Sequence, residues 1–168
     1  MTQDRHLTDH FTFHELTRTD HADLQEDNRR VTPEEELKLV VLAELLEHCR
    51  EAIGLGLDVH SGRRCPALNK RVGSSDKSQH LRCEAADFSP AGPDTEASVV
   101  DAWQKVATAS RAGKFKFGQL IVESAAGRDG ARKVWVHVSL GAPYRDPARC
   151  GEVLEMKDGA YKLISRIV

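Results

Sequence analysis

The longest stretch in which hydrophobic positions recur every three or four residues predicts an amphipathic helix from Thr32 to Gly54. Within it, apolar residues recur at helical spacing at Leu37, Val40, Val41, Leu45 and Leu46. Thr32 is suited to cap the helix, with Pro33 in its first turn and Glu35 at the capping-box position. Gly54 is a natural stop. We therefore expect a helix of about five turns that packs on the core.

A second helix is predicted from Asp94 to Ser110. Its apolar stripe consists of Val99, Val100, Trp103, Val106 and Ala107. Near the N-terminus, Thr12 can cap a short helix together with Glu15. Residues 20–31 are charged and lack apolar periodicity, which predicts a loop.

Several short runs have the composition of β-strands. They are Leu57–His60, Ala85–Phe88, Gln119–Glu123, Val134–Leu140, Val153–Met156 and Tyr161–Ile164. The last two flank Asp158-Gly159, which is a strong turn signal, so they predict a hairpin. The loop between the third and fourth runs is expected to cover residues 124–133.

These elements predict an α+β fold in which two main helices pack on an antiparallel sheet. We expect one domain over residues 1–168, with an N-terminal segment at 1–31 and a C-terminal hairpin at 151–168. A chain of 168 residues is long enough to bury a core by itself.

Composition narrows the function classes. The formal net charge of -2 argues against a general nucleic-acid-binding protein, and no apolar run is long enough to span a membrane. The polar N-terminus lacks a secretory signal, so we expect synthesis in the cytoplasm, and we expect a monomer. The four cysteines are scattered without a Cys-x-x-Cys pair, which favours free thiols.

Three residues could ligate a metal ion. His80 and Asp87 lie seven positions apart, and His137 lies in the strand-like run Val134–Leu140. Two imidazoles and a carboxylate form a three-ligand set that leaves one zinc position open for water, as in hydrolytic sites. On residue chemistry alone, structural roles for these three residues are equally consistent with the pattern.

The surrounding motifs favour the metal site. Five short segments occur in order: Ser61–Asn69, Val72-Gly73, Ser78–His80, Ala85–Phe88 and Trp135–Ser139. Together they resemble the zinc D-alanyl-D-alanine carboxypeptidases, a peptidoglycan-cleaving family that includes phage L-alanoyl-D-glutamate endopeptidases. The resemblance extends to about Leu140. It implies the fold shared by hedgehog proteins and D-Ala-D-Ala peptidases.

The resemblance also implies roles for individual residues. His80, Asp87 and His137 match the ligands of a single zinc ion. Arg64 matches an arginine that binds substrate and polarises the scissile carbonyl, and Ser78 matches a serine of the substrate pocket.

The general base is less directly assigned. Many relatives carry an acid shortly before the last histidine, where this chain has Val134 and Trp135. The phage-type pattern Gln-Leu-Ile-x-Glu points to Glu123 instead. If Glu123 pairs with Trp135 across an antiparallel ladder, Glu123 and His137 share one face of the sheet. Asp129 is the alternative base.

One residue departs from the family pattern. Cys83 stands where the family usually has glycine, which raises the question of reduced activity. An additional ligand role for Cys83 is disfavoured, because a catalytic site must keep one coordination position open.

The function that this resemblance implies is zinc-dependent hydrolysis of peptidoglycan stem peptides, by a carboxypeptidase or by an endolysin-type endopeptidase. One alternative is a catalytically silent zinc-containing module that binds cell wall or peptide. Another is a peptidase that acts on a phage structural protein. Without a signal peptide, a wall-cleaving enzyme needs phage-mediated release or a place in the virion, so a phage or prophage origin is expected.

Overall fold

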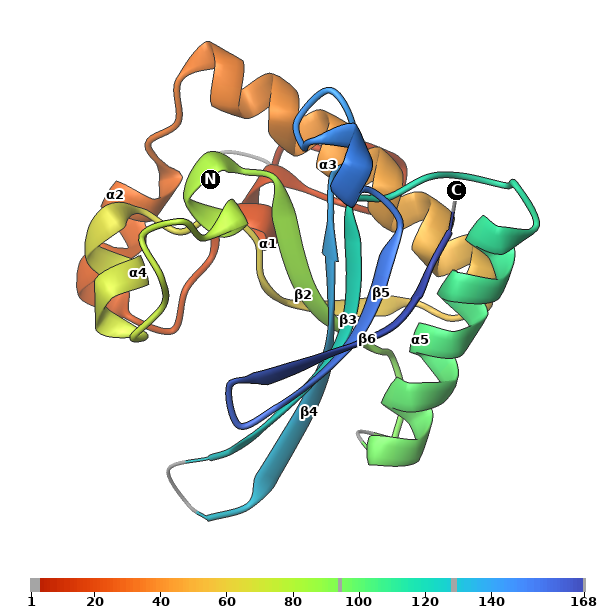
Figure 1. Cartoon of the computed structure of the whole chain (residues 1–168). Helices are drawn as coiled ribbons and strands as arrows, with labels where there is room; N and C mark the ends of the chain where they lie inside the picture. Colours follow the sequence, from red (N-terminus) through yellow and green to blue (C-terminus); the bar gives the residue numbers. More distant parts are fainter. Residues whose placement is uncertain (1–3, 94, 128–129, 168) are drawn as a thin grey trace.

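Six strands form one continuous sheet, and two long helices pack against one of its faces (Figure 1). The computed structural model describes residues 4–93, 95–127 and 130–167. The strands are β1 (Leu57–Ser61), β2 (Ala85–Pro90), β3 (Gln119–Ala126), β4 (Arg132–Ser139), β5 (Glu152–Lys157) and β6 (Ala160–Arg166). Their order is β1-β2-β4-β3-β5-β6, and neighbours are antiparallel except for the parallel pair β3 and β5. The α+β class is confirmed.

The helices lie mostly where the sequence predicts them. They are α1 (Phe13–Thr17), α2 (Gln25–Arg29), α3 (Pro33–Ile53), α4 (Pro66–Arg71) and α5 (Glu96–Arg111), with 3-10 turns η1 (Ala22–Leu24), η2 (Gln79–Arg82) and η3 (Pro147–Arg149). The capping box at the start of α3 is present, because Thr32 Oγ1 accepts from the Glu35 amide and the Thr32 amide donates to Glu35. Gly54 ends α3 with a φ of 79°, a left-handed conformation that favours glycine.

The buried face of α3 differs from the predicted stripe. Leu37 is 68% exposed, whereas Leu39 and Leu42 are completely buried. Apolar residues occupy more than one side of this helix, so spacing alone could not select the face. Packing against α5 and β2 selects it.

Residues 20–31 are not a loop, contrary to the expectation from the sequence. They contain η1 and α2. Leu24 packs with Cys65 and Leu68, and the buried Asn28 side chain bonds the backbone of Thr17, Arg63 and Cys65. These tertiary contacts, rather than an apolar stripe, stabilise helices too short to form alone.

The β3–β4 hairpin is longer than predicted, because the strands extend to Ala126 and from Arg132. The expected loop 124–133 is correspondingly shorter, and Asp129 lies outside the described residues. Side chains alternate along both strands. Leu120, Val136 and Val138 face the helices, whereas Ile121 and Trp135 pack on the opposite face.

The C-terminal hairpin is confirmed as β5 and β6, joined at Asp158-Gly159 with φ values of 50° and 86°. Both turn residues have positive φ, as the tightest hairpin turns require. Because β5 pairs with β3, the hairpin lengthens the sheet beyond the β1–β4 core. Across the described residues, the structure shows no helix long and apolar enough to cross a membrane.

Candidate metal centre and active-site cavity

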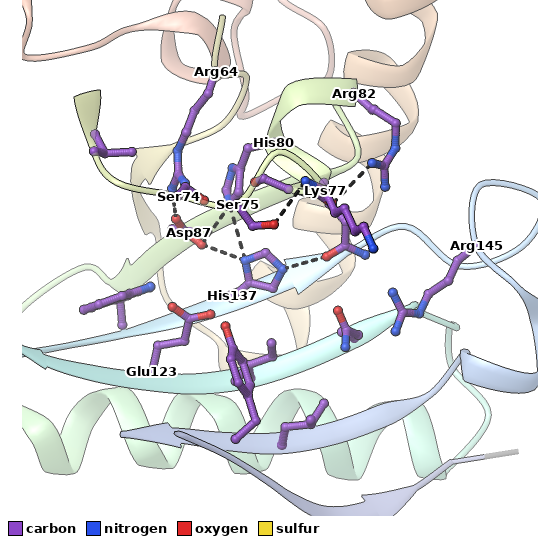
Figure 2. A pocket seen from close by; sticks show the side chains of 18 of the residues that line it. Arg64, Ser74, Ser75, Lys77, His80, Arg82, Asp87, Glu123, His137 and Arg145 are labelled. Carbon is purple, nitrogen blue, oxygen red and sulfur yellow. Dashed lines mark hydrogen bonds and ion pairs between the residues drawn. The ribbon is translucent and has the colours of Figure 1, made fainter. Parts of the chain in front are cut away.

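His80, Asp87 and His137 converge on one point of the sheet face that the helices leave uncovered (Figure 2). Asp87 and His137 are paired residues of β2 and β4, and His80 reaches them from η2. His80 Nε2 lies 3.3 Å from both His137 Nδ1 and Asp87 Oδ1, and His137 Nδ1 lies 2.8 Å from Asp87 Oδ1. All three side chains are buried.

This donor set fits a zinc ion. Ligands at about 2.0–2.1 Å from a tetrahedral zinc ion lie about 3.3 Å from one another, and two of the three observed separations have that value. Two imidazoles and a carboxylate this close together need a hydrogen-bonding proton or a cation between their facing atoms. Three protein ligands also leave the fourth position open, as catalytic zinc sites require.

Hydrogen bonds orient both imidazole rings toward the metal position. His80 Nδ1 lies 2.7 Å from the Gly62 carbonyl oxygen and donates to it, which leaves Nε2 as the ligand atom. His137 Nε2 lies 3.2 Å from Gln79 Oε1 and donates there, which leaves Nδ1 as the ligand atom. Gln79 is in turn held by its donation to Ser139 Oγ at 2.9 Å. Both rings are thereby set in the tautomer that a metal ion needs.

Gly62 is required at its position for a steric reason. A Cβ atom there would lie 2.4 Å from the Leu16 carbonyl oxygen, far inside van der Waals contact. The close approach of α1 and β1 therefore places the Gly62 carbonyl where His80 binds it.

The ionisation states of the ligands also suit a cation. Burial lowers the pKa of His80, which favours the neutral imidazole that ligates metals. Burial by itself would raise the pKa of Asp87. When no cation is bound and the two rings carry protons on the nitrogens that face Asp87, the charge of His80 and hydrogen bonds from both histidines outweigh burial and hold the pKa of Asp87 well below its usual value.

Gln79 was not singled out from the sequence, although it directly precedes His80. Replacing Gln79 with leucine is expected to weaken zinc binding by about 10- to 100-fold, the usual cost of losing a partner that orients a ligand. Titration against a chromophoric chelator measures this affinity. Gln104→Leu on the exposed side of α5 is the control, and equal affinities of the two variants would show that Gln79 does not orient His137.

Arg64 lies in the wall of the cavity, next to the metal ligands. Its NH2 group donates to Asp87 Oδ2 at 2.6 Å, and its Nε donates to Ser61 Oγ at 2.9 Å. Arg64 therefore holds the carboxylate that faces the metal position. Ser78, just before η2, lines the same cavity. Substrate contacts of Arg64 and Ser78 stay predictions.

Glu123 lies on the same sheet face as His137. It pairs with Trp135, which was the condition for this shared face, and Ile121, two residues earlier, pairs with His137. Burial, with a smaller contribution from the charge of Asp87, raises the pKa of Glu123 to about 7 against the opposing effects of His137 and Arg64. A carboxylate with this pKa can accept and release a proton near neutral pH. The catalytic role of Glu123 stays a prediction.

Cys83 lies apart from this metal group. Among the described residues, the possible metal ligands that cluster here are His80, Asp87 and His137. Cys83 is completely buried in the main core with φ 60° and ψ 32°, and burial raises the pKa of its thiol to about 12. It therefore occupies the backbone conformation for which glycine is usual, as a neutral core residue.

The metal ligands lie in a cavity of about 1150 Å³. Its walls come from the loop at residues 72–79, from strands β2, β3 and β4, and from the C-terminal segment that contributes Arg145, Arg149, Leu154 and Tyr161. This volume can hold several residues of an extended peptide.

Comparison with known proteins gave one family. A family model described as Peptidase M15 matches residues 9–138, which is more than half of the chain and includes His80, Asp87, Glu123 and His137. A search of curated proteins found no match.

Proposed function

The chain belongs to the peptidase M15 family of zinc D-Ala-D-Ala carboxypeptidases, and from this we propose that it hydrolyses peptide bonds in the stem peptides of bacterial peptidoglycan. One observation carries the proposal. His80, Asp87 and His137 bring three ligand atoms together at the floor of a large cavity, with Glu123 on the same sheet face.

A zinc ion held by these residues would lower the pKa of a coordinated water molecule to about 7 and polarise the scissile carbonyl. Glu123 accepts a proton from the attacking water molecule while the oxygen of that water forms a bond to the carbonyl carbon. When the carbon–nitrogen bond breaks, Glu123 returns that proton to the leaving amine. Its pKa of about 7 suits both transfers.

Arg64 contributes through its fixed position. Its bonds to Asp87 and Ser61 use two of the five N–H donors of the guanidinium. The donors that remain suit the developing oxyanion, where preorganised hydrogen bonds stabilise a transition state most.

Digestion of defined muropeptides by zinc-loaded protein, read by mass spectrometry, tests the function. We expect products whose masses sum to that of the substrate plus one water, and the cleaved bond identifies a carboxypeptidase or an endopeptidase. Zinc and muropeptide binding without cleavage at any pH would indicate a silent binding module. Cleavage of a phage structural protein, but of no muropeptide, would indicate the other alternative.

The place of action is part of the same proposal. The residues Gln119–Glu123 resemble the Gln-Leu-Ile-x-Glu pattern of phage-type relatives, and this resemblance supports the proposal of release through phage lysis or presence in a virion. A gene placed among metabolic genes, far from lysis and tail genes, would contradict this origin.

The pH profile follows from Glu123. A general base works only when ionised, so kcat/KM of the zinc-loaded protein is expected to rise with pH through a midpoint at about pH 7 or below and then level off. A pKa of about 7 is an upper limit for Glu123 in the zinc-loaded protein, because a nearby cation lowers the pKa of a carboxylate. Zinc content measured at each pH distinguishes loss of activity by protonation of Glu123 from loss of activity by release of the metal. A limb centred above about pH 8 would assign the profile to another group.

A further inference from the structure

We propose that the end of the cavity opposite Glu123 is a subsite for a carboxylate of the substrate, built around Arg145. The inference rests on the proposed peptidase function and specifies the substrate further. Four basic residues line this end of the cavity: Lys77, Arg82, Arg145 and Arg149. Figure 2 shows Lys77, Arg82 and Arg145 on one side of His137 and Glu123 on the other.

The strand register places this end relative to the metal ligands. On the cavity face, Asp87, His137, Ile121 and Leu154 are consecutive partners in one row across the sheet. The row that contains Glu123 lies two residues along the strands from this metal-ligand row. The row that contains Ser139, Gln119 and Glu152 lies two residues from the metal-ligand row in the opposite direction.

Each of these rows lies about 7 Å from the metal-ligand row, since a strand rises 3.2–3.4 Å per residue. Glu123 and Glu152 are therefore on opposite sides of the metal position. An extended peptide spans about 3.5 Å per residue. A group that reaches the Glu152 row is about one to three residues from the scissile bond.

Glu152 holds Arg145 in place at this row. Arg145 NH2 donates to Glu152 Oε2 at 2.7 Å, and Arg145 Nε donates to the Arg149 carbonyl at 3.0 Å. These bonds use two of the five guanidinium N–H donors. The side chain is only 12% exposed, so the guanidinium reaches the cavity as a fixed fork. Such a fork matches the two oxygens of a carboxylate.

Acidic and basic side chains lie toward different ends of the cavity, with the basic cluster at the end that contains Arg145. Among the described residues, the carboxylates that line the cavity are Asp87, at the metal position, and Glu123, beyond it. Glu84 anchors Arg82 at 2.8 Å as Glu152 anchors Arg145, whereas Arg149 is 61% exposed and Lys77 is exposed. This end therefore attracts an anion, and the anionic groups of a peptide are carboxylates.

The subsite lies largely outside the matched family region. Arg145, Arg149 and Glu152 follow residue 138, where the family match ends. The C-terminal segment therefore adds a specificity element to the zinc centre.

Matched synthetic peptides test the subsite. One pair differs in a C-terminal carboxylate or carboxamide, and a second pair, with an amidated C-terminus, differs in an internal Glu or Gln. Zinc-loaded wild-type protein is expected to bind the carboxylate member of one pair about 10- to 100-fold more tightly. The pair that shows the preference identifies a terminal or a side-chain carboxylate. Calorimetry measures binding, and KM and kcat are measured for any peptide that is cleaved.

Arg145→Gln is expected to remove this preference, weakening only the carboxylate peptide by at least about 10-fold with kcat unchanged. Arg166→Gln is the matched control, because Arg166 also bonds Glu152, at 3.1 Å, but does not line this cavity. Arg149→Gln, at an exposed position, is a second variant and is expected to reduce the preference in part. Thermal unfolding checks that each variant is folded, which we expect because Glu152 keeps other partners.

An unchanged preference in Arg145→Gln, or no preference in wild type, would overturn the subsite. Failure of the peptidase proposal has a different signature, which is binding of zinc and peptide without cleavage. The calorimetric comparison decides the subsite in either case.

Discussion

Replacing His80 with alanine is expected to abolish stoichiometric zinc binding and to lower peptidase activity by at least about 1000-fold. Within the part of the chain that the structure describes, His80 Nε2 is one of three candidate ligand atoms at this position. Its loss leaves two ligands, fewer than a catalytic zinc site uses. Metal analysis of the purified protein and hydrolysis of a defined muropeptide measure the two effects.

The control for this substitution is His60→Ala. His60 lies in neighbouring β1, is exposed and bonds Ser89 Oγ at 2.8 Å, away from the metal ligands. It is expected to keep one zinc ion and full activity. Asp87→Asn, with nearly the same shape, is a second variant in case His80→Ala fails to fold. Full activity in either ligand variant, with no metal bound, would overturn the zinc mechanism.

Replacing Glu123 with glutamine is expected to lower kcat by about 100- to 10,000-fold while zinc content and peptide affinity stay unchanged. Glutamine has the shape of glutamic acid but cannot accept the proton of the attacking water. His80, Asp87 and His137 remain intact, so the metal should remain. Single-turnover kinetics and metal analysis separate the two properties.

The same substitution has a testable effect on stability. Burial raises the pKa of Glu123 to about 7, so ionisation of this group is less favourable in the folded state than in the unfolded chain. Its contribution to stability is therefore greatest at low pH and is lost as pH rises toward 7. In metal-free protein at pH 8, Glu123→Gln is expected to be at least as stable as wild type.

Two further variants complete the test of the base. Glu155→Gln removes an exposed glutamate from neighbouring β5 and should leave activity unchanged. If Glu123→Gln retains wild-type activity and Asp129→Asn does not, Asp129 is the base.

Local patterns predicted much of the fold because they act between residues close in sequence. The capping box at Thr32 and Glu35 set the start of α3, and Asp158-Gly159 set the turn of the last hairpin. Strand alternation implied that Glu123 and His137 would share a sheet face if Glu123 paired with Trp135, and the structure supplies that pairing. The prediction of a loop at residues 20–31 was wrong, because α2 depends on contacts of Leu24 and Asn28 with distant segments.

The sequence by itself determined the candidate ligands, His80, Asp87 and His137, because their chemistry and order within short motifs can be read without a fold. Only the tertiary structure decided how they work together. Strand pairing places Asp87 beside His137, and hydrogen bonds from Gly62 and Gln79 set both imidazoles toward the metal position. It also placed Glu123 and Arg145 on opposite sides of that position. The physical reason is that register and ring orientation depend on packing between distant segments, which no local pattern records.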